Sequence, residues 1–587
     1  YDLAVRRELI QLGRENRLVR QVRSCEATDQ ENIFTTVYCY ILGPHETITP
    51  NTQEVHATDF VSLETELRVM AEDEDQYAGI KEVLNDREIV SDLVQVSSEI
   101  RQYRLAVGGR VKMNEIMFRL KNRFVNFTVN SVAFVTPEAA PFIKTGGLGD
   151  VAGEQPQEIA VLGADVSIFT IAYEAVLEDF NLHDTGLVVP FFIAGEYAPI
   201  RIFTKKQGAV TYYFLYNRQY SIGPYVGDAL RLTIFLSEGT LLAIEKLVSR
   251  GFMINPQVIH ANDWQTALIP VYLKTKYHEH PLFRYTASVF TIHNQKYRGE
   301  WIRGDRYPEL GIGGEHWMGM VQRDDRDHFC LLRGGISHMD KGNAVSRTNR
   351  DELLMDEHGE SLAADFRERA DDMEGIINGV DYDVWTPVSL EEKPLVKAQL
   401  QASLGFEVDP SIPLIGMVAR IAKQKNSRRL VNVIRRLIDE SGGRIQFVYL
   451  GKGNENDPYN QRTRRFMDLV AKDHRYARNV RFLHRYTTEE QKRVFGGIDI
   501  FTYPSLYEPC GTKPMVALIN GTPCVVRNTG GLADNVQEYR RATQTGNGFV
   551  FAKDSYRDMR NAFWRALDIF HDQDHWQRIT YNAQNYD

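Results

Sequence analysis

Three clusters of charged and small residues have the composition of an anion-binding site. The first is the run KTGGLGD at residues 144–150, where Lys144 precedes Gly146 and Gly147. Glycines let backbone N–H groups approach an anion closely, and a helix that starts beside them adds positive partial charge. The run lacks the Gly-Lys-Ser/Thr ending of a Walker loop and the G-x-G-x-x-G dinucleotide fingerprint. Taken alone, it predicts either a phosphate-binding turn or a simple turn.

The second cluster is a pair of cations. Arg420 and Lys425 stand five residues apart, just past the predicted strand 414–419. An arginine fork and a lysine point charge together suit a diphosphate leaving group. A solvated basic loop is the alternative, and Lys423 is interpreted as a solvated member of it.

The third cluster could bind a sugar and its phosphate. Glu508 lies in the run PSLYEPCG at residues 504–511, and its carboxylate could accept hydrogen bonds from sugar hydroxyl groups. The alternative is a glutamate that caps a helix in a strand-to-helix turn, and the neighbouring Cys510 is interpreted as a packed thiol. Glycines whose backbone N–H groups could meet phosphate follow: Gly511, Gly530 and Gly531.

These clusters require a scaffold that presents loops at one edge of a sheet. From residue 129 onward, short β-branched apolar runs alternate with helical stretches, as in doubly wound parallel sheets. The predicted strands are 131–136, 165–171, 257–260, 288–293, 375–378, 414–419, 445–450, 480–483, 499–503, 523–527 and 548–551. The pattern restarts after Trp385, so we expect two α/β domains, 129–387 and 388–587, that face a cleft. In such sheets ligands bind at the carboxyl ends of the strands.

Residues 1–128 have a different composition, with few glycines and many charges. Ile89, Leu93, Val96, Ile100 and Tyr103 follow helical spacing, as on one helix face or a short coiled-coil seam. A second helical face is predicted at 113–120. We expect a helical extension that either packs on its own body or binds a protein partner or a second copy.

The composition narrows the function classes. The chain has 587 residues, 43% hydrophobic and 25% charged, with a formal net charge of −9. This is typical of a soluble globular protein with little general attraction for nucleic acid or membranes. No run of about 18 apolar residues predicts a membrane span. The five cysteines show no paired metal spacing, which favours a reducing compartment.

No metal or other cofactor is expected. Two D-x-D runs, Asp325–Asp327 and Asp381–Asp383, imitate a metal motif but are interpreted as acids of surface loops. A dinucleotide-dependent dehydrogenase is disfavoured, because the glycine fingerprint and its acidic partner are missing.

From about residue 130 to 587 the chain resembles the bacterial glycogen synthases and plant starch synthases, retaining glucosyltransferases of the two-domain GT-B fold. The three clusters carry this resemblance in order and spacing. Further matching segments are Val258–Gln265, Thr291–Asn294 with Tyr297 and Gly299, Ala344–Ser346, and Ile377–Asp381 before Trp385.

The resemblance implies roles for individual residues. Arg420 and Lys425 would hold the departing diphosphate, and Glu508 would orient the glucose hydroxyl groups. His293 would contact the donor glucose, and Asp263 would lie near the acceptor. The remaining substrate-binding residues would be Lys144, Gly146, Gly147, Gly511, Thr529, Gly530 and Gly531. The domain 129–387 would take the acceptor and 388–587 the nucleotide sugar.

The sequence departs from the family pattern at several positions. Family members usually have His at Asn262, a small or apolar pair at Gln295 and Lys296, Gly at Asn426, and Leu-Thr-Gln at residues 512–514. Pro514 removes an N–H close to the expected phosphates, so donor affinity should fall if that group matters. Asn426 tolerates a left-handed backbone conformation better than most residues.

Three functions remain open. The favoured one is a synthase that extends α-1,4-glucan chains from ADP-glucose or UDP-glucose, with ADP-glucose favoured. The second is a synthase-like scaffold without catalysis that acts in glucan priming or complex assembly. The third is another GT-B transferase, such as one that makes sucrose or a glycoside. The expected compartment is the cytoplasm or the plastid stroma, and the sequence does not decide between them.

Overall fold

The computed structural model describes residues 19–23, 37–40, 129–485 and 487–586. Strands β1 (Val19–Arg23) and β2 (Val37–Tyr40) pair antiparallel. The prediction of helix is therefore wrong at these residues, where β-branched and aromatic residues favour a strand. The helical faces predicted at 89–103 and 113–120 lie outside the described residues. Residues 131–276 and 288–587 form a compact unit of their own.

A nine-stranded sheet of order β15-β14-β11-β10-β3-β4-β9-β8-β5 forms what we call the first lobe. The strands from β15 to β9 pair parallel wherever a register is defined, and β8 and β5 add an antiparallel edge. Their bounds are β3 Ser131–Val135, β4 Asp165–Ile171, β5 His183–Val189, β8 Ile200–Gln207, β9 Val210–Tyr216, β10 Val258–Asn262, β11 Ala287–Ile292, β14 Lys341–Ala344 and β15 Met373–Gly375.

The antiparallel edge, β9 and β14 are absent from the sequence prediction. Strands β8 and β9 form a hairpin whose turn contains Gly208 at φ 59°. Two small ribbons also occur: β6 Phe192–Ile193 with β7 Glu196–Tyr197, and β12 Glu300–Ile302 with β13 His328–Cys330. The helices of this lobe are α6 Gly147–Val161, α7 Glu174–Asp179, α8 Ala229–Ser249, α9 Leu268–Lys274, α10 Arg303–Arg306, α11 Leu331–His338, α12 Arg347–Leu353, α13 Asp356–Gly359 and α14 Ala363–Glu368.

A six-stranded parallel sheet of order β18-β17-β16-β19-β20-β21 forms what we call the second lobe. Its strands are β16 Leu414–Val418, β17 Gln446–Leu450, β18 Val480–Leu483, β19 Ile500–Tyr503, β20 Cys524–Arg527 and β21 Gly548–Phe551. In chain order this arrangement is 3-2-1-4-5-6, that of dinucleotide-binding domains, with a switch point between β16 and β19. The prediction of two doubly wound sheets is confirmed.

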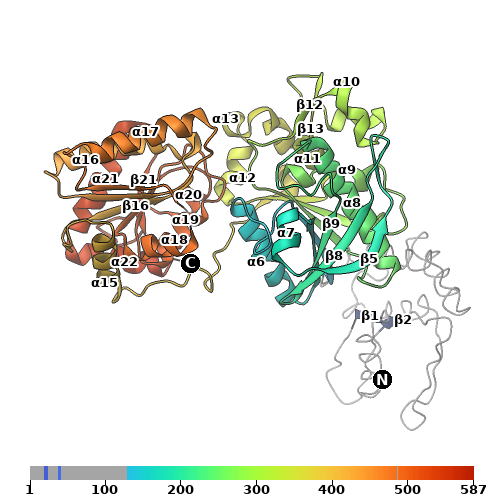
Figure 1. Cartoon of the computed structure of the whole chain (residues 1–587), viewed down its shortest axis with the longest axis horizontal. Helices are drawn as coiled ribbons and strands as arrows, with labels where there is room; N and C mark the ends of the chain where they lie inside the picture. The colour runs from blue at the N-terminus through green and yellow to red at the C-terminus, as the bar shows by residue number, and fades with distance from the viewer. Residues whose placement is uncertain (1–18, 24–36, 41–128, 486, 587) are drawn as a thin grey trace, which may run out of the picture. The chain divides into compact units, whose positions relative to one another are not determined.

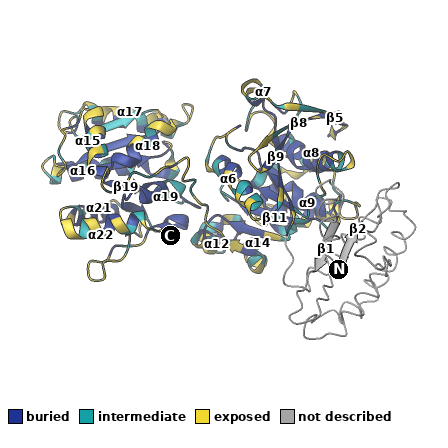
Figure 2. Cartoon of the chain, turned by 90° about the horizontal axis from the view of Figure 1, so that it is seen from below, coloured by how far each residue is buried: buried dark blue, intermediate teal, exposed yellow. Residues whose placement is uncertain are grey.

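Helices cover both faces of the second sheet. Figure 1 shows α16 and α17 above it and α15, α18 and α22 below it. Their bounds, with those of the remaining helices, are α15 Lys393–Ser403, α16 Ser427–Glu440, α17 Pro458–Lys472, α18 Thr488–Gly497, α19 Thr512–Ile519, α20 Gly530–Asn535, α21 Tyr556–Phe570 and α22 Gln573–Gln584. Figure 2 shows that the sheets are buried and that exposed residues lie on the outer helix faces. Among the described helices, none is long and apolar enough to cross a membrane.

One ion pair is buried inside the second lobe. Lys397 on α15 lies 2.7 Å from Asp499, and the two side chains are only 6% and 10% exposed. The same Asp499 carboxylate accepts a hydrogen bond from Leu414 N, the first residue of β16. A buried charge is costly without a partner, so Lys397 and Asp499 each stabilise the other in the folded chain.

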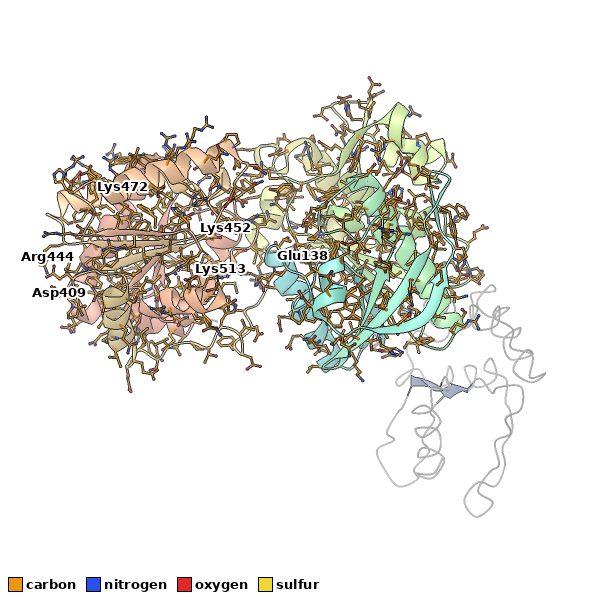
Figure 3. All side chains as sticks on the ribbon, viewed as in Figure 1. Glu138, Asp409, Arg444, Lys452, Lys472 and Lys513 are labelled. Carbon is orange, nitrogen blue, oxygen red and sulfur yellow. The ribbon has the colours of Figure 1, made fainter. Side chains whose placement is uncertain are left out.

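We predict that Asp499→Asn lowers the free energy of unfolding by about 3 kcal/mol, because Lys397 keeps a buried charge without its partner. Calorimetric melting measures the loss. The matched control is Arg444→Gln, which breaks the Arg444–Asp409 pair of the same lobe (Figure 3), 61% and 26% exposed. An exposed pair of this kind contributes less than about 1 kcal/mol. Equal effects of the two variants would contradict the prediction.

Candidate functional site

Several of the predicted site residues follow the strands at the switch points of the two sheets. In the second lobe β16 and β19 are neighbours, paired at Ile415 and Ile500. Arg420 comes just after β16, and Glu508 follows β19. In the first lobe β3 and β10 are neighbours, and the KTGGLGD loop and Asp263 follow them. Ligands of doubly wound sheets bind at such positions.

Lys425 and Glu508 form a direct ion pair. Both side chains are largely buried, 8% and 11% exposed, and Lys425 Nζ also lies 4.5 Å from the centroid of the Tyr503 ring. Gln424 connects the loop after β16 to the loop after β19. Its side-chain Nε2 donates to Tyr507 O at 3.1 Å, and its backbone O accepts from Leu506 N at 2.8 Å. The sequence predicts Lys425 and Glu508 for one site, and the structure brings them into contact.

Arg420 differs from Lys425 in its surroundings. Its side chain is exposed, whereas its backbone oxygen accepts a hydrogen bond of 3.4 Å from the Tyr449 hydroxyl group. An exposed guanidinium at the carboxyl end of β16 keeps its bidentate face accessible to an anion.

The segment Thr529–Gly531 packs tightly on the Glu508 loop. A side chain at Gly530 would lie 2.0 Å from Glu508 O, and one at Gly531 would lie 1.8 Å from Cys510 O. Gly531 N donates to Glu508 O at 3.0 Å. Close packing alone therefore requires both glycines.

A carboxylate of the first lobe binds the same segment. Glu352 on α12 accepts hydrogen bonds from Thr529 Oγ1 and Gly530 N, both at 3.0 Å. Thr348, also on α12, donates to the Asp534 carboxylate through its N–H at 3.0 Å and its hydroxyl group at 2.6 Å. Of the N–H groups that the sequence predicts for phosphate, Glu352 thus engages that of Gly530, together with the Thr529 hydroxyl group.

A buried carboxylate also binds the KTGGLGD loop. Glu138 accepts hydrogen bonds from the Thr145 amide, from Thr145 Oγ1 at 2.9 Å, from Gly146 N at 3.2 Å and from the Tyr225 hydroxyl group at 3.0 Å. Lys144 pairs with Asp150 inside the same loop. The sequence predicts a helix after this run; the structure begins α6 at Gly147, inside the run.

Sequence reasoning missed Glu138 and Glu352. Glu138 stands six residues before Lys144, so an acid between a strand and a glycine loop is a local signal for its role. Glu352 lies far from Gly530 in sequence, and no local pattern points to this contact.

His293 and Asp263 belong to one hydrogen-bonded cluster. Asp263 N donates to Thr291 O at 2.9 Å, and Asn294 N donates to the Asp263 carboxylate at 3.4 Å. Asp263 has φ 63°, a strained backbone conformation for an aspartate. This strain directs its side chain toward the loop that carries His293.

Asn262 fixes the orientation of His293. Its amide Nδ2 donates to Val135 O and His260 O, both at 3.2 Å, so its Oδ1 faces the histidine. His293 Nε2 lies 3.0 Å from this oxygen and must therefore donate to it. Burial, together with the nearby His260, lowers the pKa of His293 to about 3. His293 is accordingly a neutral imidazole that keeps Nδ1 as an acceptor.

Residues 512–514, which depart from the family pattern, form the first turn of α19. Gly511 precedes the helix at φ 80°, and Pro514 is buried in its first turn. Lys513 lies 4.4 Å above the Trp385 ring, and burial lowers its pKa to about 8. Burial raises the pKa of the Cys510 thiol to about 12, so this cysteine stays protonated. Its packed position agrees with the interpretation from sequence.

The D-x-D run at residues 381–383 holds its own loop in shape by hydrogen bonds to backbone N–H groups. Asp381 Oδ1 accepts from Asp383 N at 2.7 Å and from Val384 N at 3.2 Å, as in an Asx turn. Within the part of the chain that the structure describes, no group of three or more His, Cys, Asp or Glu residues is placed to hold a metal ion.

We predict that Asp263 makes stability fall as pH rises. Burial raises the pKa of Asp263 to about 7, whereas an unfolded aspartate titrates near about 3.9. Between these values the unfolded chain ionises Asp263 and the folded chain does not, so stability decreases between about pH 4 and about pH 7.

Asp263→Asn should make the fall of stability with pH less steep, because the residue that releases one proton on unfolding is gone. Melting temperatures measured across that pH range test it. Glu154, whose pKa burial and Asp381 raise to about 7, keeps its own share in both proteins. Identical slopes in wild type and variant would contradict the prediction.

Comparisons with known proteins agree with the geometry. The family model "Starch synthase catalytic domain" matches residues 131–368, and "Glycosyl transferases group 1" matches residues 405–586. The chain is 32% identical to a glycogen synthase of Bacillus anthracis and 34% to one of Thermotoga maritima, covering 96% and 95% of those proteins and 78% of itself in both cases.

A solved structure is also similar. The catalytic domain of starch synthase IV from Arabidopsis thaliana, bound to ADP and acarbose, aligns with a TM-score of 0.69 at 26% identity, over 78% of this chain and 96% of that one. The resemblance seen in the motifs is thereby confirmed, together with glucosyl transfer as the reaction class. The chain belongs to the glycogen and starch synthase family of GT-B glycosyltransferases.

Proposed function

We propose that this enzyme transfers glucose from ADP-glucose to the non-reducing end of an α-1,4-glucan with retention of configuration. The observation that supports this proposal most directly is the group of Arg420, Lys425 and Glu508 at the switch point of the second sheet. The ADP in the similar starch synthase supports ADP-glucose over UDP-glucose as the donor. In this proposal residues 388–587 bind the nucleotide sugar and residues 129–387 bind the glucan.

Charge complementarity supports the placement of the donor. Negative charge grows on the diphosphate as it leaves, and preorganised cations stabilise that charge most effectively. Lys425 is held in place by Glu508 and Tyr503, so its ammonium group needs little reorganisation. Arg420 provides the exposed guanidinium, and Lys144 with Gly146, Gly147 and Gly511 completes the diphosphate site.

Glu508 serves the sugar in this proposal. One carboxylate oxygen, Oε2, pairs with Lys425, while Oε1 accepts hydrogen bonds from glucose hydroxyl groups. The neutral His293 presents Nδ1 to the glucose. Asp263, beside the His293 loop, lies on the acceptor side.

The leaving phosphate itself accepts the proton of the acceptor hydroxyl group in front-face attack. This route needs no pair of enzyme carboxylates and no metal, and we propose that the enzyme uses neither.

Thr529, Gly530 and Gly531 are also proposed to bind the donor. Because Glu352 holds Thr529 Oγ1 and Gly530 N, a phosphate must replace its carboxylate there. Exchange of one anion for another at fixed donors conserves their hydrogen bonds.

Two wider proposals remain from the sequence. The enzyme works in the cytoplasm or in the plastid stroma. Residues 1–128 bind a protein partner or a second copy of the chain.

Transfer of labelled glucose into glycogen tests the function. We expect incorporation from ADP-glucose that exceeds incorporation from UDP-glucose. Lys425→Ala should reduce turnover by about a hundredfold or more, because one preorganised electrostatic group contributes about that factor.

Lys423→Ala is the matched control, since Lys423 is an exposed cation beside Lys425. It should retain wild-type turnover. Incorporation from neither nucleotide sugar, or full activity of Lys425→Ala, would refute the proposal.

A further inference from the structure

The loop that follows β11 carries a cation close to His293 in sequence. Lys296 stands three residues after His293. Its Nζ pairs with Glu360, and the two side chains are 29% and 35% exposed. The same Nζ lies 5.1 Å from the centroid of the Tyr507 ring. Lys296 thus contacts the first lobe and the second lobe at once.

Two neighbours of Lys296 bind the same segment as Glu360. Gln295 Nε2 donates to His358 O at 3.3 Å, and Arg298 Nη1 donates to Ser361 Oγ. Successive side chains of one loop therefore fasten it to residues 358–361. Glu360 itself has φ 52°, a conformation that favours glycine, and the ion pair helps to hold it there.

The contact with Tyr507 reaches the donor site. Tyr507 precedes Glu508, and its backbone oxygen accepts the hydrogen bond from Gln424 described above. A cation over an aromatic face attracts the ring, and the attraction grows as water is excluded. Burial lowers the pKa of Lys296, with Arg298 as a second contribution, so the ammonium group has lost part of its hydration.

We propose that Lys296 is a positioning residue for glucosyl transfer: paired with Glu360 and seated on Tyr507, it sets the spacing between the loop of His293 and the loop of Glu508. The inference rests on the proposed function, because it concerns groups assigned there to the glucose. The ion pair with Glu360 orients the ammonium group of Lys296, and the ring of Tyr507 forms its cation–π contact.

Kinetics of Lys296→Met test the role, because methionine keeps the length of the side chain and removes the charge. We expect kcat to fall about tenfold to a hundredfold, since small misplacements of reacting groups have effects of that size. The KM for the donor should stay within about threefold, because Arg420 and Lys425 bind the diphosphate without Lys296. A raised donor KM with unchanged kcat would overturn the inference.

Lys296→Arg should retain at least about half of the turnover, because guanidinium pairs with carboxylates and stacks on aromatic rings. A variant with arginine as impaired as the methionine variant would overturn the positioning role. Lys341→Met is the matched control: its pair with Asp372, 2.8 Å long, lies at the amino end of β14, and turnover should not change.

A charge exchange separates the two contacts of Lys296. The double variant Lys296→Glu with Glu360→Lys keeps an ion pair but removes the cation from the loop of His293. We expect turnover to remain as low as in Lys296→Met. Full recovery would show that the pair alone matters and would overturn the part assigned to Tyr507.

Hydrogen exchange tests the inference independently of activity. In Lys296→Met the amides of residues 504–511 and 358–361 should exchange faster than in wild type, with the melting temperature unchanged. Unchanged exchange in residues 504–511 would overturn the inference. Failure of the wild-type enzyme to use either nucleotide sugar would instead refute the proposed function, and the exchange data would still decide the spacing role.

Discussion

The site depends on carboxylates of the chain that pair with its cations and backbone amides. Cations and hydrogen-bonded backbone amides follow the carboxyl ends of parallel strands in both sheets. Several of the groups predicted for the donor are matched by an acid of the chain: Lys425 by Glu508, Lys144 by Asp150, Gly146 by Glu138, and Thr529 and Gly530 by Glu352. Like charges packed closely would otherwise repel.

This pairing shapes the chemistry of the site. A diphosphate brings more charge than a single carboxylate, so it can replace an acid at the same donors without leaving them unsatisfied. Glu352 and Thr348 connect α12 to residues of the Glu508 side of the site, and Ser346 Oγ donates to Pro509 O at 2.5 Å. In the proposed function, phosphate at Gly530 would therefore be coupled to contacts between the lobes, whereas Lys425 is held by Glu508 and Tyr503.

Much of the fold could be predicted from the sequence because buried parallel strands are continuous apolar runs. Strands β4, β18 and β21 occupy the predicted residues 165–171, 480–483 and 548–551. Strands β5 and β8 could not be recognised in this way, since each is partly exposed and its apolar run is interrupted. Segment 19–23 is likewise mixed in polarity, and a helical pattern elsewhere in residues 1–128 obscured its pairing with 37–40.

The chemistry of the site could be predicted only where residues act close to their sequence neighbours. Asn426 illustrates the predictable part: it adopts φ 56° before α16, as its tolerance of that conformation suggests. Asn262 illustrates the other part, because its amide orients His293 only through Val135 O and His260 O, which the fold brings together.

Gln295 and Lys296 extend the same argument. Judged alone, two polar residues in place of a small or apolar pair are only a departure from the family pattern. Their partners His358 and Glu360 stand more than sixty residues away, and they turn this departure into a set of contacts around the His293 loop. A departure from a family pattern can therefore be judged only together with the residues that it meets in space.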